Sequence, residues 1–323
     1  MAETDLKTAA KLAWLYTLPL IEIAAVRARG LSVGSRMNAF GHMRNLADHT
    51  SRAVTTPNND TLYSTAQIDL SQGPVSITLP PAGERYISLQ LMDAYSNSFA
   101  VLGTRTTGPE GGTFTLVGPG EAAEGPNVVR APTRHVWALA RVLVEGPHDL
   151  EAARAVQHGV SAQGPEVAPP PAFANRGAGW ADYFRTASQL LTLNPPPVTD
   201  RAMLARMAPL GLGEGFDPSR FSPEEAQQIE AGAAEARREA RGGGGLVGGQ
   251  AIEGWTYPNP RLGDFGQDYG LRATVALGGL AALPVVEASY FRAIGPMPRG
   301  LFDGGRLWRL HFAAQAHLPV DSF

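Results

Sequence analysis

Cysteine is absent from this 323-residue sequence, and lysine occurs only as Lys7 and Lys11. Without cysteine the chain cannot form disulfides, thiol nucleophiles, thiolate zinc sites or iron–sulfur clusters. Both lysines lie near the N-terminus, which excludes a Schiff-base or phosphate-binding lysine deeper in the chain. Positive charge is not in excess either, because 27 basic residues face 30 acidic ones, for a net charge of −3. Nucleic acid is therefore not expected as a partner, since binding phosphates needs clustered positive charge.

Nucleotide-binding and metalloprotease motifs are also missing. The sequence has no P-loop and no H-E-x-x-H, and the glycine-rich residues 211–215 follow no strand. Residues 30–34 match G-x-S-x-G, but a helix precedes them where a nucleophile elbow needs a strand, so a helix end is predicted. His42 and His49 would share one face of a helix, which keeps a bound metal ion open as a hypothesis. No cofactor is assigned.

The N-terminal apolar stretch, residues 12–26, follows the two lysines in the manner of a signal peptide. Pro19 and Glu22 interrupt it and no clean cleavage site follows, which argues against a signal peptide. The stretch is too short to span a bilayer, so no membrane span is expected. Its helical periodicity predicts an amphipathic helix, kinked or restarted at Pro19. The chain as given is expected to be cytoplasmic, and periplasmic if its natural N-terminus was trimmed.

Glycine and proline are abundant, at 37 and 26 residues, and predict many turns. Between these turns, short segments alternate between apolar and polar residues, the pattern of half-buried strands. Strands are predicted at residues 62–68, 75–79, 87–91, 114–117 and 136–144. Frequent turns between short strands predict an antiparallel β-sandwich or barrel.

Helical segments follow this β region. One is predicted at 149–157, three between 180 and 241, and one at 268–283. Ser222, Pro223 and Glu225 form a capping box that starts the third of the middle segments. Residues 285–294 and 307–312 predict further strands. The fold class is thus β-rich α+β, and the expected domains are 1–160 (helix and β domain), 161–250 (loop and helices) and 251–323 (start of a second β domain).

The candidate site centres on a polar cluster before the first of these strands. Asn58, Asn59 and Asp60 are good turn residues, but they also offer several donors and acceptors to a ligand or metal. Asp60 and Asp93 are candidate acid–base residues, and Tyr63 is a candidate hydrogen-bond donor.

Arg141 shares a strand face with apolar neighbours, so its guanidinium needs a carboxylate or a ligand as partner. Asp60 and Asp93 are candidates for an internal ion pair, and a substrate carboxylate is the rival interpretation. The other ligand-binding candidates are Arg105, Tyr257, Asp268 and Arg272.

Several long motifs resemble bacterial families of unknown function. Residues 56–64 (TPNNDTLYS), 85–108, 114–120 and 131–150 resemble the domain family DUF1254. Residues 254–291, beginning GWTYPNPRLGDFGQDYG, resemble the stretch leading into its usual partner, DUF1214. The resemblance implies an antiparallel β domain, a helical region and a jelly-roll-like C-terminal β domain, truncated here. Many relatives are exported, and most have no assigned activity.

Two classes of function stay open. One is an enzyme of hydrolase or lyase type acting on a small carboxylate-bearing or aromatic molecule. The alternative is a non-catalytic ligand-binding or assembly module, or an inactive truncated relative. A homo-oligomer is compatible with either.

Overall fold

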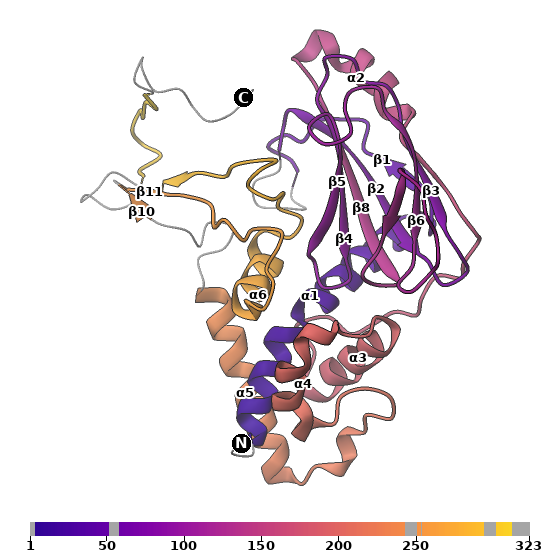
Figure 1. Ribbon diagram of the computed structural model, residues 1–323. Coiled ribbons are helices and arrows are strands. Elements are labelled where there is room, and N and C mark those ends of the chain that lie inside the picture. Colours follow the sequence, from indigo (N-terminus) through magenta and orange to yellow (C-terminus); the bar gives the residue numbers. More distant parts are fainter. Residues whose placement is uncertain (1–3, 52–57, 243–250, 253, 294–301, 312–323) are drawn as a thin grey trace.

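The computed structural model describes residues 4–51, 58–242, 251–252, 254–293 and 302–311. Figure 1 shows a β-sandwich beside a group of helices, with the N-terminal helix α1 (Leu6–Ser32) running from the helices toward the sandwich. The predicted class, mixed α+β with antiparallel sheets, is confirmed. The domain boundaries at 160 and 250 stay predictions.

Five antiparallel strands form the larger sheet, called sheet A here, in the order β1-β2-β8-β4-β5. They are β1 (Phe40–His42), β2 (Thr61–Asp69), β8 (His135–Leu143), β4 (Ile87–Asp93) and β5 (Ser98–Gly103). The predicted strands at 62–68, 87–91 and 136–144 therefore lie side by side. Their alternating pattern arises because one face of sheet A packs into the sandwich and the other faces the helices.

The second sheet, sheet B, has the order β7-β6-β3-β9. Its strands are β7 (Val128–Arg130), β6 (Gly112–Val117), β3 (Val75–Leu79) and β9 (Ser161–Gln163). The pair β6–β7 is parallel, an exception to the predicted antiparallel pairing. Aliphatic side chains from both sheets fill the sandwich, among them Leu62, Ile77, Leu89 and Val142.

A second core holds the helices together around α1. Residues of α1 such as Trp14 and Leu18 pack against the other helices of this core, which are α3 (Trp180–Leu193), α4 (Arg201–Met207), α5 (Pro223–Gly242) and α6 (Tyr269–Gly278). At Gly232 of α5 the helices approach so closely that a Cβ atom would lie 2.1 Å from the Lys7 carbonyl oxygen. Helix α2 (Leu150–His158) packs against the sandwich.

Helix α1 is longer than the predicted segment and continues through Pro19 without a break. Its 27 residues would suffice to cross a membrane, but 78% of its most apolar window is buried inside the protein. A core helix and an N-terminal signal sequence pass the same test. The G-x-S-x-G match proves to be the end of this helix, which terminates at Ser32 before Gly34, whose φ is 94°.

The capping box of α5 forms as predicted, with Glu225 N donating to Ser222 Oγ at 3.2 Å and Ser222 N donating to Glu225 Oε2 at 2.8 Å. The predicted C-terminal strands form only in small part. Within 285–294, residues 292 and 293 form β12 (Arg292–Ala293), which pairs with β11 (Trp255–Thr256), and β11 also pairs with β10 (Ala251–Ile252). Residues 285–291 and 307–311 form no strand, and residues 294 and 312 lie outside the described residues. An apolar run becomes a strand only where a partner supplies a ladder of hydrogen bonds.

Candidate functional site

The candidate site is a cavity of about 290 Å³ where the β4–β5 turn, the 3-10 turn Val198–Asp200 and the start of α6 meet. Six polar residues line it, namely Asn97, Thr199, Asp200, Asp264, Gln267 and Arg272. Gln267 Nε2 donates to the Thr199 carbonyl at 2.7 Å, which ties two of these segments together at the mouth. Two predicted site residues meet here, because Arg272 lines the cavity and Asp93 lies in the same β4–β5 turn as Asn97.

Arg272 enters the site from α6, and Asp268 starts that helix. Asp268 accepts a hydrogen bond from Leu271 N at 2.9 Å, so its role is that of an N-cap. The Arg272 side chain is 2% exposed and lies over the rings of Tyr16, Tyr95 and Tyr269, at 5.0, 5.3 and 5.1 Å from their centroids. These cation–π contacts offset part of the cost of burying the guanidinium.

The hydrogen bonding of Arg272 is incomplete within the described part of the chain. Its guanidinium makes one hydrogen bond there, from Nη2 to the Tyr16 carbonyl at 3.4 Å, and Nε has no partner. A guanidinium has five N–H donors, so most of this donor capacity is left over. A buried cation with free donors beside a cavity favours an anionic ligand.

Asp200 provides the negative charge of the site. It is 3% exposed and accepts hydrogen bonds from the hydroxyls of Tyr16, at 2.7 Å, and Tyr269, at 3.0 Å. Burial and the bond to Asp200 raise the pKa of Tyr269 to about 12, and burial raises that of Tyr16 further. Both tyrosines are therefore neutral donors near pH 7, and neither contributes a positive charge beside the Asp200 carboxyl group.

Asp93 supports the β4–β5 turn from behind the cavity. Its carboxylate accepts from Tyr95 N and Asn97 N at 2.9 Å, and from Asn97 Nδ2 at 3.0 Å. Burial raises the pKa of Asp93, while the bonds from Asn97 and the charge of Arg272 act in the opposite direction. Asp93, predicted as an acid–base residue, is thus a neighbour of the cavity with its oxygens already bonded.

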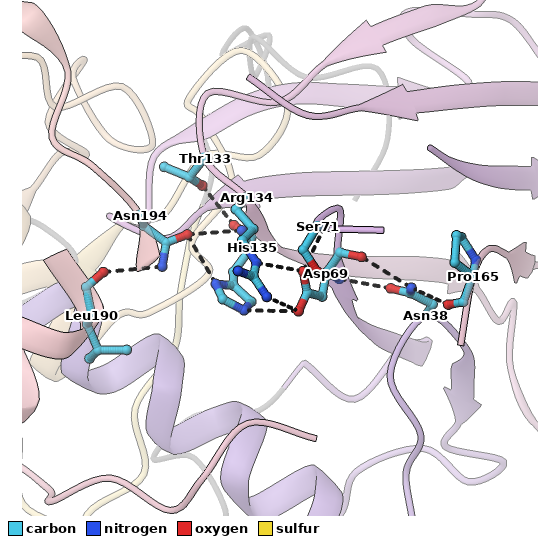
Figure 2. Close-up of polar contacts among 9 residues, drawn as sticks. All are labelled: Asn38, Asp69, Ser71, Thr133, Arg134, His135, Pro165, Leu190 and Asn194. Carbon is cyan, nitrogen blue, oxygen red and sulfur yellow. Dashed lines mark hydrogen bonds and ion pairs between the residues drawn. The ribbon is translucent and has the colours of Figure 1, made fainter. Parts of the chain in front are cut away.

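A second buried polar network adjoins the site (Figure 2). Arg134 donates two hydrogen bonds to the Asp69 carboxylate, at 2.8 and 3.0 Å, and His135 Nε2 lies 3.5 Å from the same carboxylate. On its other side, His135 Nδ1 lies 3.2 Å from Asn194 Oδ1. Burial would raise the pKa of Asp69, but the hydrogen bonds from His135, Arg134 and Ser71 outweigh it and hold the pKa far below its usual range.

Asn194 joins this network to the cavity. Its carbonyl accepts from the Tyr95 hydroxyl at 2.7 Å, and the ring of Tyr95 lies against Arg272. The polar groups between sheet A and the helices therefore form one connected layer, from Asp69 through His135 and Asn194 to Tyr95 and Arg272 at the cavity.

Three residues of the site, Asp200, Tyr16 and Asn194, were not predicted from the sequence. The spacing of Tyr269 and Arg272, three residues apart on one helix face, was a readable signal.

The Asn58–Asp60 cluster lies elsewhere. Asn59 and Asp60 line another cavity, of about 410 Å³, and Asn58 accepts from Asp60 N at 2.8 Å as in an Asx turn. Tyr63 lies on the helix-facing side of sheet A, where its ring contacts Arg141. The predicted site residues therefore do not form one pocket.

Arg141 is buried as predicted, but it forms no ion pair with a described residue. Its Nη1 donates to Gln90 at 3.0 Å and its Nη2 to the Ala281 carbonyl at 2.8 Å. The predicted pairing with Asp60 or Asp93 does not form. Arg105 instead pairs with the buried carboxylate of Glu287, which also accepts from the Tyr86 hydroxyl at 2.6 Å.

The remaining candidates lie outside the cavity. Tyr257, 40% exposed, contacts Phe291 edge to face near the small C-terminal sheet. His42 is in β1 and His49 in an exposed loop, so they do not share a helix as predicted. No group of three or more histidine, aspartate or glutamate side chains among the described residues could hold a metal ion.

One solved structure shares this fold. The chain superposes on the VPA0106 protein from Vibrio parahaemolyticus with a TM-score of 0.67 and 19% identity, covering 87% of this chain and 69% of that one. An uncharacterized protein from Burkholderia cenocepacia matches with a TM-score of 0.31 and 12% identity, over 78% of this chain and 66% of that one. No curated protein matches.

Residues 37–164 match the model of the family described as "Protein of unknown function (DUF1254)". This stretch contains β1 to β9, so the match covers both sheets of the sandwich.

Proposed function

We propose that this protein binds a small organic molecule through a carboxylate, in the cavity beside Arg272. The observation that carries the proposal is a guanidinium that is 2% exposed, lines the cavity and forms no ion pair among the described residues. Burying an arginine is costly unless its donors are satisfied. A carboxylate satisfies two of them at once in a planar, charge-assisted pair.

The tyrosine rings around Arg272 support this role. They hold the guanidinium in place from three sides and leave its edge as the part that can donate hydrogen bonds. A fixed donor loses less entropy on binding than a flexible surface arginine would. The cavity of about 290 Å³ suits a small molecule.

Isothermal titration with benzoate and 3-phenylpropanoate tests the proposal. The wild type is expected to bind at least one of them, and Arg272→Gln to bind it at least tenfold more weakly. Arg185→Gln, which alters an exposed ion pair with Asp182, is the matched control and should bind like the wild type. A thermal melt of each variant separates lost binding from lost folding, and Arg272→Lys retains the charge if glutamine is not tolerated. Equal binding by folded Arg272→Gln, or no binding by the wild type, would contradict the proposal.

Turnover distinguishes the two forms of this proposal, an enzyme of hydrolase or lyase type and a non-catalytic binding module. Native mass spectrometry of the purified protein would identify a retained molecule, and incubation with that molecule would show whether it is converted.

We also propose that residues 254–291 belong to DUF1214 and lead into a jelly-roll domain. The support for this proposal is the motif resemblance.

A further inference from the structure

The charges on the cavity wall are of both signs. Arg272 provides one positive charge, while Asp200 and Asp264 provide two negative ones. Arg272 and Asp200 are buried, at 2% and 3% exposure, whereas Asp264 is exposed. The buried wall of the cavity therefore carries a guanidinium and a carboxylate that form no ion pair with each other, and its exposed part carries a further carboxylate.

We infer that the ligand of this cavity is a zwitterion, an α-amino acid or a similar small molecule with an ammonium group beside its carboxylate. The inference rests on the proposed function, in which Arg272 takes the carboxylate. A ligand with only a carboxylate would bring a third negative charge to a wall that already holds two. An added ammonium group removes this repulsion and gives each charge on the buried wall a partner of opposite sign.

Asp200 has room for such a partner. A carboxylate offers about four lone-pair positions, and the hydroxyls of Tyr16, Tyr269 and Thr199 use three of them, the last at 3.4 Å. Both phenols are neutral, so they orient the carboxylate and leave its charge in place. An ammonium group donates three hydrogen bonds, which Asp200 and the nearby side-chain oxygens of Thr199 and Asn97 can accept.

Three compounds that share one carbon skeleton separate the charges. Phenylalanine carries both groups, 3-phenylpropanoate lacks the ammonium, and 2-phenylethylamine lacks the carboxylate. Isothermal titration at pH 7 is expected to show phenylalanine binding at least tenfold more tightly than either of the others. If 3-phenylpropanoate binds as tightly as phenylalanine, the zwitterion inference is overturned and the proposed function stands. If the amine alone binds as tightly as phenylalanine, or if no compound binds, both are overturned.

Substitutions of the two aspartates test whether they bind the ammonium group of the ligand. Asp200→Asn keeps the shape of the side chain and is expected to remove most of the preference for phenylalanine over 3-phenylpropanoate. Asp264→Asn, at an exposed position where folding is not at risk, should reduce the preference severalfold. Asp60→Asn is the matched control, because Asp60 lines the other cavity, and it should leave the preference unchanged. An unchanged preference in both Asp264→Asn and folded Asp200→Asn would overturn the assignment.

Discussion

The two faces of sheet A are both buried, yet they differ in polarity, because charged side chains lie among apolar ones such as Trp137 and Leu139 on the face toward the helices. The face inside the sandwich carries aliphatic residues such as Leu89 and Val142. The face toward the helices carries Asp69, His135 and Arg141, all buried as well. Neighbouring residues on one strand, Arg141 and Val142, thus lie in a polar and an apolar environment.

The difference shows where function is located. Burial of aliphatic groups stabilises the sandwich without specifying a ligand. In the polar layer every buried group needs a partner, so an unsatisfied group is informative. Asp69 has a full set of partners and Arg272 does not, which is why the cavity beside Arg272 is the candidate site.

The largest effects are expected from truncating one residue on each face. Leu89→Ala leaves a cavity in the sandwich, and Asp69→Ala leaves Arg134 and His135 without their carboxylate. Each should lower the free energy of unfolding by about 3 kcal/mol at pH 7, measured by urea denaturation.

The dependence on pH distinguishes the two variants. The pKa of Asp69 is lower in the folded state, so its contribution is complete above the unfolded value of about 4 and is lost as pH falls below it. The difference in free energy of unfolding between the wild type and Asp69→Ala should therefore become smaller below about pH 4. The corresponding difference for Leu89→Ala should not change with pH. Parallel pH profiles of the two variants would show that Asp69 acts only through packing.

The sequence predicted on which face of a strand a residue lies better than it predicted the residue's hydrogen-bond partners. The alternation in residues 136–144 placed Arg141 on one face of a strand, because a strand has period two. Its partners, Gln90 and the Ala281 carbonyl, were not predictable, since they come from another strand and from a segment 140 residues away. The same holds for the bond from Tyr16 to Asp200, which joins residues 184 positions apart.

Within the candidate site, the residues found from sequence were those in unusual local patterns. Asp93 was predicted as an acid–base residue and Arg272 as a ligand-binding residue, and the cavity lies beside both. Asn58 to Asp60 stood out equally but form a turn at another cavity. Composition of a loop shows which groups are available, and only the fold determines which of them converge.

A smaller effect, with the opposite pH dependence, is expected at Asp93. Burial raises the pKa of Asp93, so the folded state binds a proton more strongly than the unfolded state and stability falls as pH rises above about 4. Asp93→Asn removes the charge, and rotation of the Asn97 amide can supply an acceptor to the new side chain. Relative to this variant, the wild type should lose stability between pH 4 and neutrality. Thermal or urea unfolding across this range measures the difference, and a wild type that gains stability over it would contradict the assigned pKa direction.

The smallest effect is expected at Ser96, where the polar layer carries backbone strain. Ser96 has a φ of 67°, and its buried hydroxyl has no hydrogen-bond partner among the described residues. Glycine adopts this conformation without the cost of about 1–2 kcal/mol that other residues incur, although its unfolded state gains about 0.5–1 kcal/mol of entropy. Ser96→Gly should therefore stabilise the protein by about 0.5 kcal/mol. Gly103→Ala is the contrasting variant, because its Cβ would lie 2.2 Å from the Ile87 carbonyl oxygen. If Ser96→Gly destabilises the protein instead, the strain at Ser96 is smaller than the entropy that glycine adds to the unfolded chain.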